Sequence, residues 1–135
     1  MKRGTFIDTV YILAALNPRD RWHGKAVELS QVRRTPLVTS DAVLTEVADA
    51  LAHRSRRMWA SQAIDDLRAD PDVKCVSVDA AIFAGGLDLY RERPDKDWSL
   101  TDCISFVIMR QQQITDALTA DLHFVQAGFR ALMQE

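Results

Sequence analysis

The clearest hydrophobic pattern in the chain lies between residues 40 and 51. Leu44, Val47, Ala48 and Leu51 recur at positions i, i+3, i+4 and i+7, with mostly polar residues between them. This spacing places the four apolar side chains on one face of a helix, and Ser40 is a favoured residue for its N-terminal cap. The pattern predicts a helix that starts after residue 40 and packs this face against a core.

Short apolar runs alternate with helical patterns along the rest of the chain. We expect strands at residues 5–7, 37–39, 73–78, 115–119 and 129–133. We expect further helices at residues 9–16, 21–34, 55–68, 80–91, 101–113 and 121–127. Strands separated by helices predict an α/β fold with a mostly parallel sheet covered on both faces. Because the pattern contains no repeat or linker, we expect a single domain over residues 1–135.

The predicted helix at residues 80–91 contains two adjacent glycines, Gly85 and Gly86. Each glycine costs roughly 1 kcal/mol of helix stability relative to alanine. Close packing against a neighbouring element would explain the pair, and a local break in the helix would explain it equally well.

Composition limits the classes of protein that remain. The chain has 135 residues, a length that is enough for a core without disulfides. Its residues are 47% hydrophobic and 27% charged, and this composition argues against disorder. The formal net charge of −2 gives no global attraction for nucleic acid, so such binding would need a local basic patch.

Cellular location is predicted from two features of the sequence. Cys75 and Cys103 show no paired spacing, so we expect buried thiols in a reducing compartment, with a catalytic cysteine as the alternative. No secretory signal pattern is visible, and the longest apolar stretch near the start is too short to span a bilayer. We therefore expect a cytoplasmic protein.

Three aspartates stand at predicted helix starts. Asp8 and Asp121 each follow a strand and precede a helix, while Asp102 ends the S-x-x-D capping pattern that begins at Ser99. Each aspartate alone is explained as a helix cap. Together they allow a second interpretation, because strand-to-helix junctions of a parallel sheet lie at one edge, where ligands bind beside the reversal of strand order. Asp8 and Asp121 would lie at that edge, and Asp102 would join them if its helix begins there.

A fourth carboxylate, Glu46, flanks the apolar face of the helix that follows residue 40, although a solvated glutamate is the alternative. Carboxylates that gather in one place take up protons unless a cation balances their charge. Oxygen ligands suit Mg²⁺ or Mn²⁺ better than zinc. His23, His53 and His123 show no paired ligand spacing, so we expect them to be incidental.

Four short motifs contain these acids. They read Phe6-Ile7-Asp8-Thr9, Leu44-Thr45-Glu46-Val47, Trp98-Ser99-Leu100-Thr101-Asp102-Cys103 and Thr119-Ala120-Asp121-Leu122-His123-Phe124. In this order and spacing they resemble the motifs of the PIN domain family, and they are most similar to the single-domain VapC-type toxins of prokaryotic toxin–antitoxin pairs. The resemblance extends over nearly the whole chain.

The resemblance implies a three-layer α/β/α sandwich with a parallel sheet of order 3-2-1-4-5. It also implies an endoribonuclease that depends on Mg²⁺ or Mn²⁺, a homodimer, and a small antitoxin protein that binds over or near the site. The residues that match the family's acidic metal-binding positions are Asp8, Glu46, Asp102 and Asp121. Candidate accessory residues are Asp97, as a fifth acid at the rim, and Thr9, Ser99 and Thr119, as hydrogen-bonding neighbours.

The expected reaction is hydrolysis of an RNA phosphodiester. Asp8, Asp102 and Asp121 would hold a metal that activates water, and a second metal would stabilise the leaving 3′ oxygen. Glu46 would ligate directly or orient a metal-bound water. Arg54, Arg56 and Arg57 form the densest basic stretch and could grip phosphates, although a solvated helix junction is the alternative.

Other candidates for substrate contact are less specific. Trp59 could stack on a base, although a core or dimer contact is more usual for tryptophan. Further basic candidates are Arg33, Arg34 and Lys96.

Other classes of protein also place acids at this edge of a sheet. A receiver-type phospho-acceptor would need an acidic pair near the first strand and a late lysine, but no lysine follows Lys96. A phosphatase with an aspartyl nucleophile would need D-x-D, but Asp8 is followed by Thr9-Val10. The remaining alternative is a catalytically inactive PIN-like module that only binds RNA or a protein partner.

Overall fold

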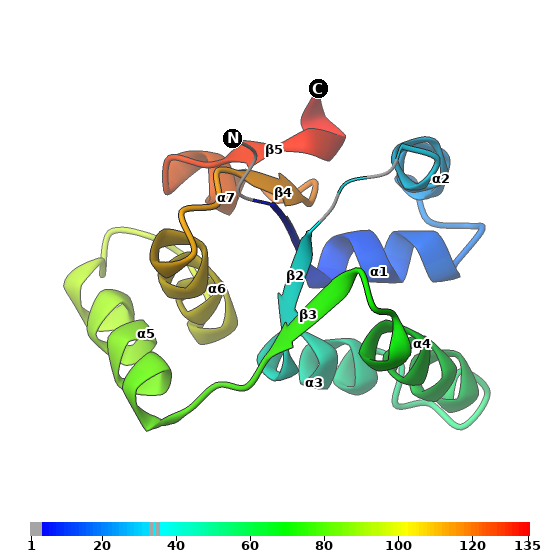
Figure 1. Cartoon of the computed structure of the whole chain (residues 1–135), viewed down its shortest axis with the longest axis horizontal. Helices are drawn as coiled ribbons and strands as arrows, with labels where there is room; N and C mark the ends of the chain where they lie inside the picture. The colour runs from blue at the N-terminus through cyan, green and yellow to red at the C-terminus, as the bar shows by residue number, and fades with distance from the viewer. Residues whose placement is uncertain (1–3, 33, 35) are drawn as a thin grey trace.

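The computed structural model describes residues 4–32, 34 and 36–135. Five parallel strands form one sheet in the order β3-β2-β1-β4-β5 (Figure 1). The strands are β1 (Thr5–Ile7), β2 (Leu37–Ser40), β3 (Val73–Val76), β4 (Asp116–Leu118) and β5 (Arg130–Ala131). The predicted fold class and strand order are therefore confirmed.

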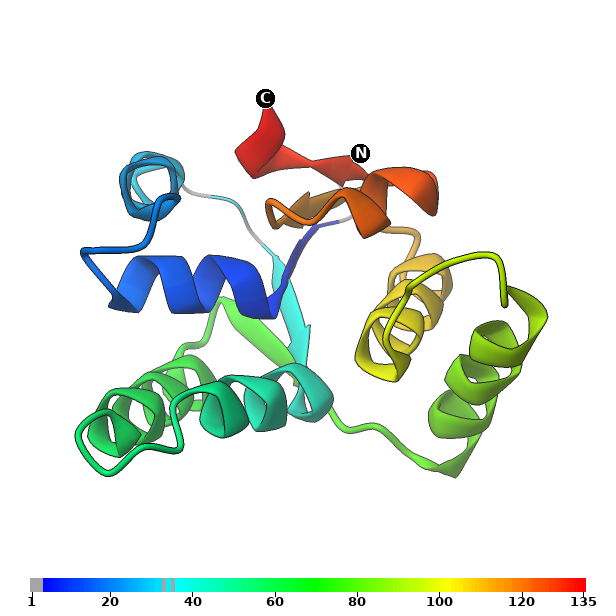
Figure 2. The same ribbon diagram turned by 180° about the vertical axis from the view of Figure 1, so that it is seen from behind.

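Helices cover both faces of this sheet. They are α1 (Thr9–Leu16), α2 (His23–Ser30), α3 (Asp41–Ala50), α4 (Arg57–Ala69), α5 (Ala80–Glu92), α6 (Leu100–Gln111) and α7 (Leu122–Gln126). Helices α1, α2 and α4 lie on one side of the sheet, and α5 and α6 lie on the other (Figures 1 and 2). Helix α3 contacts α1, α4 and α6, so it joins the two helical layers.

Local sequence signals account for several helix starts. The Ser40 side chain accepts a hydrogen bond from the backbone N–H of Val43 at 3.2 Å and so caps α3. Leu44, Val47 and Leu51 of the predicted apolar face are buried. The Asp79 side chain caps α5 in the same way, by accepting from the N–H of Ile82 at 2.8 Å. The hydrophobic pattern and the caps together fix where these helices begin.

Several predicted bounds are too long. The helix predicted at residues 21–34 is reduced to α2, and the turn before it is closed by the Trp22 N–H, which donates to the Asp20 carboxylate at 2.8 Å. The strand predicted at residues 129–133 pairs only over β5. It then turns into a short 3₁₀ helix, η1 (Leu132–Gln134), where the Met133 N–H donates to the carbonyl of Thr119 at 3.1 Å.

Both cysteines are free; Cys103 is fully buried and Cys75 is partly buried. Burial raises the pKa of each thiol, which opposes the catalytic-cysteine alternative. Within the described part of the chain, no helix has both the length and the apolar character that crossing a bilayer requires.

The glycine pair of α5 is explained by close packing against α6, and the helix continues through it without a break. A Cβ atom on Gly86 would lie 2.5 Å from Ile104 Cγ1 and 3.2 Å from the Ile104 backbone. A Cβ atom on Gly85 would meet Val107 Cγ1 at an ordinary contact distance of 3.5 Å. Gly86 therefore sets how closely α5 approaches α6.

We expect Gly86→Ala to destabilise the protein by about 1 to 3 kcal/mol, because the added methyl group would force α5 away from the Ile104 backbone. Gly85→Ala is the matched control, and it should be neutral or stabilising by up to about 1 kcal/mol through its higher helix propensity. Urea unfolding of the two variants measures the difference. Equal stabilities for the two variants would contradict the packing explanation.

Candidate active site

Asp8 and Asp121 leave two neighbouring strands at the same edge of the sheet. Strands β1 and β4 are parallel, with Ile7 opposite Leu118, and the Asp8 N–H donates to the Leu118 carbonyl at 3.2 Å. From β1 the chain continues to β2 on one side, while β4 lies on the other, so strand order reverses between β1 and β4. This is the location that parallel α/β sheets use for ligand binding.

Asp8 occupies the cap position of α1, but its side chain makes no cap hydrogen bond. Its Oδ2 instead accepts from the Thr119 hydroxyl at 2.7 Å, and only 3% of the residue is exposed. Burial raises the pKa of Asp8 to about 7, with further contributions from the charges of Asp102 and Glu46, while the Thr119 bond opposes the rise. The helix-cap interpretation is therefore wrong for Asp8. Desolvated acids of this kind are typical of functional sites.

Asp102 is both a helix cap and a member of the acidic group. The predicted capping box is present: the Asp102 N–H donates to Ser99 Oγ at 3.0 Å, and the Ser99 N–H donates to Asp102 Oδ2 at 3.1 Å. The same Oδ2 lies 3.0 Å from Nδ1 of His123. Burial raises the pKa of Asp102, the charge of Asp121 adds to the rise, and the bonds to His123 and Ser99 oppose it.

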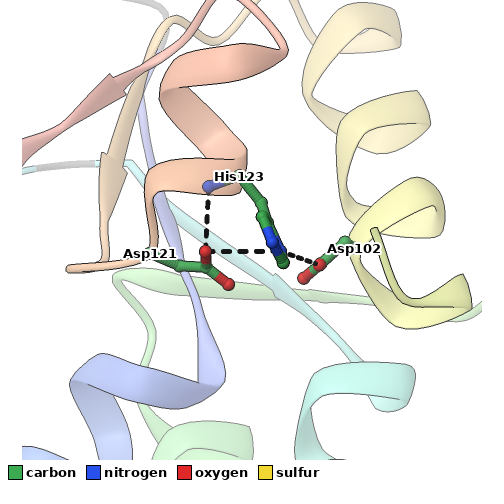
Figure 3. A group of neighbouring side chains, drawn as sticks. All are labelled: Asp102, Asp121 and His123. Carbon is green, nitrogen blue, oxygen red and sulfur yellow. Dashed lines mark hydrogen bonds and ion pairs between the residues drawn. The ribbon is translucent and has the colours of Figure 1, made fainter. Parts of the chain in front are cut away.

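Asp121 and His123 complete a compact group with Asp102 (Figure 3). Asp121 Oδ1 accepts from the His123 N–H at 2.8 Å and so caps α7, and it lies 3.4 Å from His123 Nδ1. One potential ligand atom from each of Asp102, Asp121 and His123 lies within 4.8 Å of the others. The expectation that His123 is incidental is therefore wrong. One feature of the sequence could have indicated a role for His123: it lies in the first turn of the helix that Asp121 caps.

Thr119 connects the two halves of the acidic group. Its hydroxyl donates to Asp8 and accepts from the Asp121 N–H at 3.0 Å, and the residue is fully buried. Thr9 is also buried, and its hydroxyl has no hydrogen-bond partner among the described residues. Thr119 and Ser99 thus bond to the acids, as expected of accessory residues.

The two remaining predicted acids lie at the margin. Glu46 is half-buried on α3, close enough for its charge to raise the pKa of Asp8, but it is outside the compact group. Asp97 is exposed on the loop before α6 and is also outside the compact group. Of these two acids, only Glu46 has a charge that acts on Asp8.

We expect Thr119→Val to weaken the site while keeping its shape. The valine cannot donate to Asp8 or accept from Asp121, so the RNA cleavage that the sequence leads us to expect should fall by about 10- to 100-fold, as for partners that orient metal ligands. Thr119→Ser is the matched control, because it keeps the hydroxyl and should stay within a few-fold of wild type. A Thr119→Val protein with wild-type cleavage would contradict the role of this hydroxyl.

The predicted basic stretch does not border the acids. Arg54, Arg56 and Arg57 are exposed at the junction of α3 and α4, which lies at the far end of α3 from β2 (Figure 2). One of them is tied locally, since Arg57 Nη1 donates to the carbonyl of Ala52 at 3.1 Å. Phosphates bound by these arginines would therefore lie away from Asp8.

Trp59 is not a core residue, because 41% of it is exposed. It lines an apolar pocket of about 600 Å³ between α1 and α4, together with Tyr11, Leu16 and Met58. Of the other basic candidates, Arg33 lies outside the described residues, and Lys96 lies on the loop before α6.

The sheet order 3-2-1-4-5, with acids at its switch point, is the arrangement expected of a PIN domain. Comparison with known families gives the same result. The family model of the PIN domain matches residues 5–130, so the chain belongs to the PIN domain family. Among curated proteins, the 23S rRNA-specific endonuclease VapC20 of Mycobacterium tuberculosis, in strains CDC 1551 / Oshkosh and H37Rv, is 29% identical to this chain over 124 residues. The alignment covers 92% of this chain and 94% of VapC20.

Solved structures support the same fold. A crystal structure of Mycobacterium tuberculosis VapC20, described as a toxin that cleaves the sarcin–ricin loop, has a TM-score of 0.87 and 28% identity, covering 93% of this chain and 96% of that one. VapBC2 from Rickettsia felis has a TM-score of 0.64, with 14% identity over 91% and 92% of the two chains. FitAcB from Neisseria gonorrhoeae has the same TM-score, with 20% identity over 94% of both. The last two show the fold alone.

Proposed function

We propose that the protein is an endoribonuclease that hydrolyses RNA phosphodiester bonds with Mg²⁺ or Mn²⁺ at Asp8, Asp102 and Asp121. The observation that carries this proposal is the gathering of these acids: Asp102 and Asp121 lie in one compact group with His123, and the Thr119 hydroxyl joins Asp8 to Asp121. Among the described residues, no lysine or arginine forms an ion pair with any of the three. The relative VapC20 is named a 23S rRNA-specific endonuclease, which supports RNA as the substrate class.

The acidic group fits a divalent cation. Asp8 is almost fully buried and, among the described residues, has only the neutral Thr119 hydroxyl as a side-chain hydrogen-bond partner, so a bound cation would stabilise its ionised form. Carboxylate oxygens are ligands that suit Mg²⁺ and Mn²⁺. When bound, such a metal lowers the pKa of a water molecule and neutralises charge on the phosphate.

The residues of the chain prepare the site before substrate arrives. The Thr119 hydroxyl fixes the Asp8 carboxylate, and the Ser99 N–H fixes that of Asp102. His123 acts as a positioning residue between Asp102 and Asp121. An ionised carboxylate only accepts hydrogen bonds, so Nδ1 of His123 carries the hydrogen in this arrangement. Glu46, whose charge acts on Asp8 from α3, would ligate the metal or orient a metal-bound water.

Cleavage of single-stranded RNA by purified protein tests this function. We would compare Mn²⁺, EDTA, and EDTA followed by excess Mn²⁺, on an RNA that contains a sarcin–ricin loop and on an unrelated RNA of the same length. The proposal predicts cleavage with Mn²⁺, none in EDTA, and recovery after the metal is restored. Cleavage that persists in EDTA would exclude the metal role. RNA binding without cleavage would favour the alternative, an inactive RNA- or protein-binding module.

We further propose that the chain is the toxin of a toxin–antitoxin pair, acts as a homodimer in the cytoplasm, and consists of one PIN-like unit over residues 1–135. The description of VapC20 as a toxin supports the first part of this proposal. A short reading frame beside the gene should encode a small protein that binds this chain and suppresses its cleavage of RNA. Light scattering of the purified protein should give twice the chain mass. A monomer would contradict the homodimer. A neighbouring protein that leaves RNA cleavage unchanged would contradict the toxin–antitoxin pair.

A further inference from the structure

A second cavity lies beside the acidic group, at the turn from α5 into α6. It has a volume of about 870 Å³, within the range of roughly 300 to 1,000 Å³ that is usual for ligand sites. Its wall consists of the last turn of α5 and the loop that leads into α6, and includes Tyr90, Arg91, Lys96 and Ser99. None of the three aspartates lines this cavity.

The cavity and the acidic group share a boundary. Ser99 lines the cavity, and its backbone N–H donates to the Asp102 carboxylate at 3.1 Å. Asp97, the exposed acid of the rim, lies on the same wall. A polymer bound at the carboxylates could therefore continue into the cavity across the start of α6.

The charge of the cavity is opposite to that of the whole chain. Arg91, Arg93 and Lys96 line it against one acid, Asp97, whereas the chain carries a formal net charge of −2. Arg93 is already paired, since its Nε and Nη2 donate to the two oxygens of Asp95 at 3.0 Å each. Within the described part of the chain, Arg91 and Lys96 form no ion pair. Two cations thus remain available to an anionic ligand.

Two aromatic residues complete the wall. The Trp98 ring is buried and donates through Nε1 to Gln126 Oε1 at 3.0 Å, and the Arg93 guanidinium lies 5.2 Å from the ring centroid. This packing holds the floor of the cavity in place. Tyr90, in contrast, is 49% exposed at the end of α5. An exposed ring next to unpaired cations is the combination with which proteins bind single-stranded nucleic acid.

We propose that this cavity is a substrate subsite that binds the RNA strand next to the bond to be cut. Arg91 and Lys96 contact phosphates, and Tyr90 stacks on a base. This inference rests on the proposed function, because it takes RNA as the polymer at the carboxylates. The observations favour RNA over an acidic protein segment, because a stacking ring stands with the cations and the cavity borders the proposed catalytic acids.

RNA binding measured without cleavage tests the subsite. The probe is a fluorescein-labelled single-stranded RNA of 12 nucleotides, titrated by anisotropy against Asp8→Asn protein in a series of salt concentrations. In that background, Arg91→Gln and Lys96→Gln should each make the slope of log affinity against log salt shallower by about 0.7, which is about fivefold weaker binding at 0.1 M salt. Arg19→Gln and Lys74→Gln are matched controls, because both residues are exposed and lie outside the cavity.

The aromatic contact is tested by a second pair of variants. Tyr90→Ala should weaken binding by about 5- to 150-fold, the range for loss of one stacked base, with little change in the salt slope. Tyr90→Phe keeps the ring and should bind as the unmodified background does. Thermal unfolding of each variant shows whether it is folded, and a loss of binding counts only for folded protein.

The outcomes separate this inference from the proposed function. Cleavage by the wild type, together with unchanged RNA binding by all three cavity variants, would overturn the subsite and leave the ribonuclease standing. Binding that depends on Arg91, Lys96 and Tyr90, in a wild type that never cleaves, would support the subsite and overturn the ribonuclease. Displacement of the RNA by poly-glutamate, together with no effect of Tyr90→Ala, would mark the cavity as a protein-binding site and overturn the proposal.

Discussion

Asp8→Asn is expected to lower RNA cleavage by more than about 100-fold. The amide has nearly the same shape and can still accept from the Thr119 hydroxyl, but it cannot supply the negative charge that holds a cation. Loss of a metal contribution of several kcal/mol corresponds to at least two factors of ten in rate. The measurement is the single-turnover rate on labelled RNA with saturating Mn²⁺.

The matched control for this variant is Asp79→Asn. Asp79 also stands at a helix start, but its side chain only caps α5, and asparagine caps a helix about as well. We expect Asp79→Asn to cleave RNA within about twofold of wild type. Wild-type rates from Asp8→Asn would remove Asp8 from the mechanism, whatever the control shows.

The same substitution is expected to stabilise the protein when metal is removed. Burial raises the pKa of Asp8 from 3.8 to about 7, so the folded state keeps this proton up to a higher pH than the unfolded state does. Between these values the folded state binds more protons, and wild-type stability therefore falls as the pH rises from about 4 to 7. Above pH 7, Asp8→Asn should be more stable than wild type by about 2 to 4 kcal/mol.

Urea unfolding in EDTA at pH 5 and at pH 8 measures this effect. The free-energy difference between Asp8→Asn and wild type should be larger at pH 8 than at pH 5. Adding Mn²⁺ at pH 8 should stabilise wild type more than the variant, because only the folded wild type offers the full set of acids. An Asp8→Asn protein that is less stable than wild type at pH 8 in EDTA would contradict a desolvated carboxylate at this position.

The outline of the fold could be predicted from the sequence because its signals are local. The apolar face of α3 and the caps at Ser40, Asp79 and Ser99 depend on residues within one or two helical turns. Alternation of strands and helices then restricts the sheet to a parallel one. The strand order itself depended on the resemblance to PIN domains. The predicted ends of the elements were less accurate. For example, η1 is fixed by a hydrogen bond from the Met133 N–H to the carbonyl of Thr119, which lies in another segment.

The candidate site was only partly predictable. Nothing near Asp8 in the sequence shows that its side chain turns from α1 to Thr119, which is 111 residues away. His123 was missed because its partner Asp102 belongs to a different helix. Contacts between distant segments decide these two features. The cavity before α6 is lined by a single segment, from Tyr90 to Leu100, but its hollow shape cannot be read from the order of those residues.

The central claim is that Asp8, Asp102 and Asp121 hold a divalent cation. Anomalous diffraction from crystals of the wild-type protein soaked in Mn²⁺ tests it most directly, because manganese is located without assumptions about the protein. We expect an anomalous peak in contact with carboxylate oxygens of these three residues, and no such peak in Asp8→Asn crystals treated in the same way. An empty acidic group in wild-type crystals, under Mn²⁺ conditions in which the dissolved protein cleaves RNA, would contradict it.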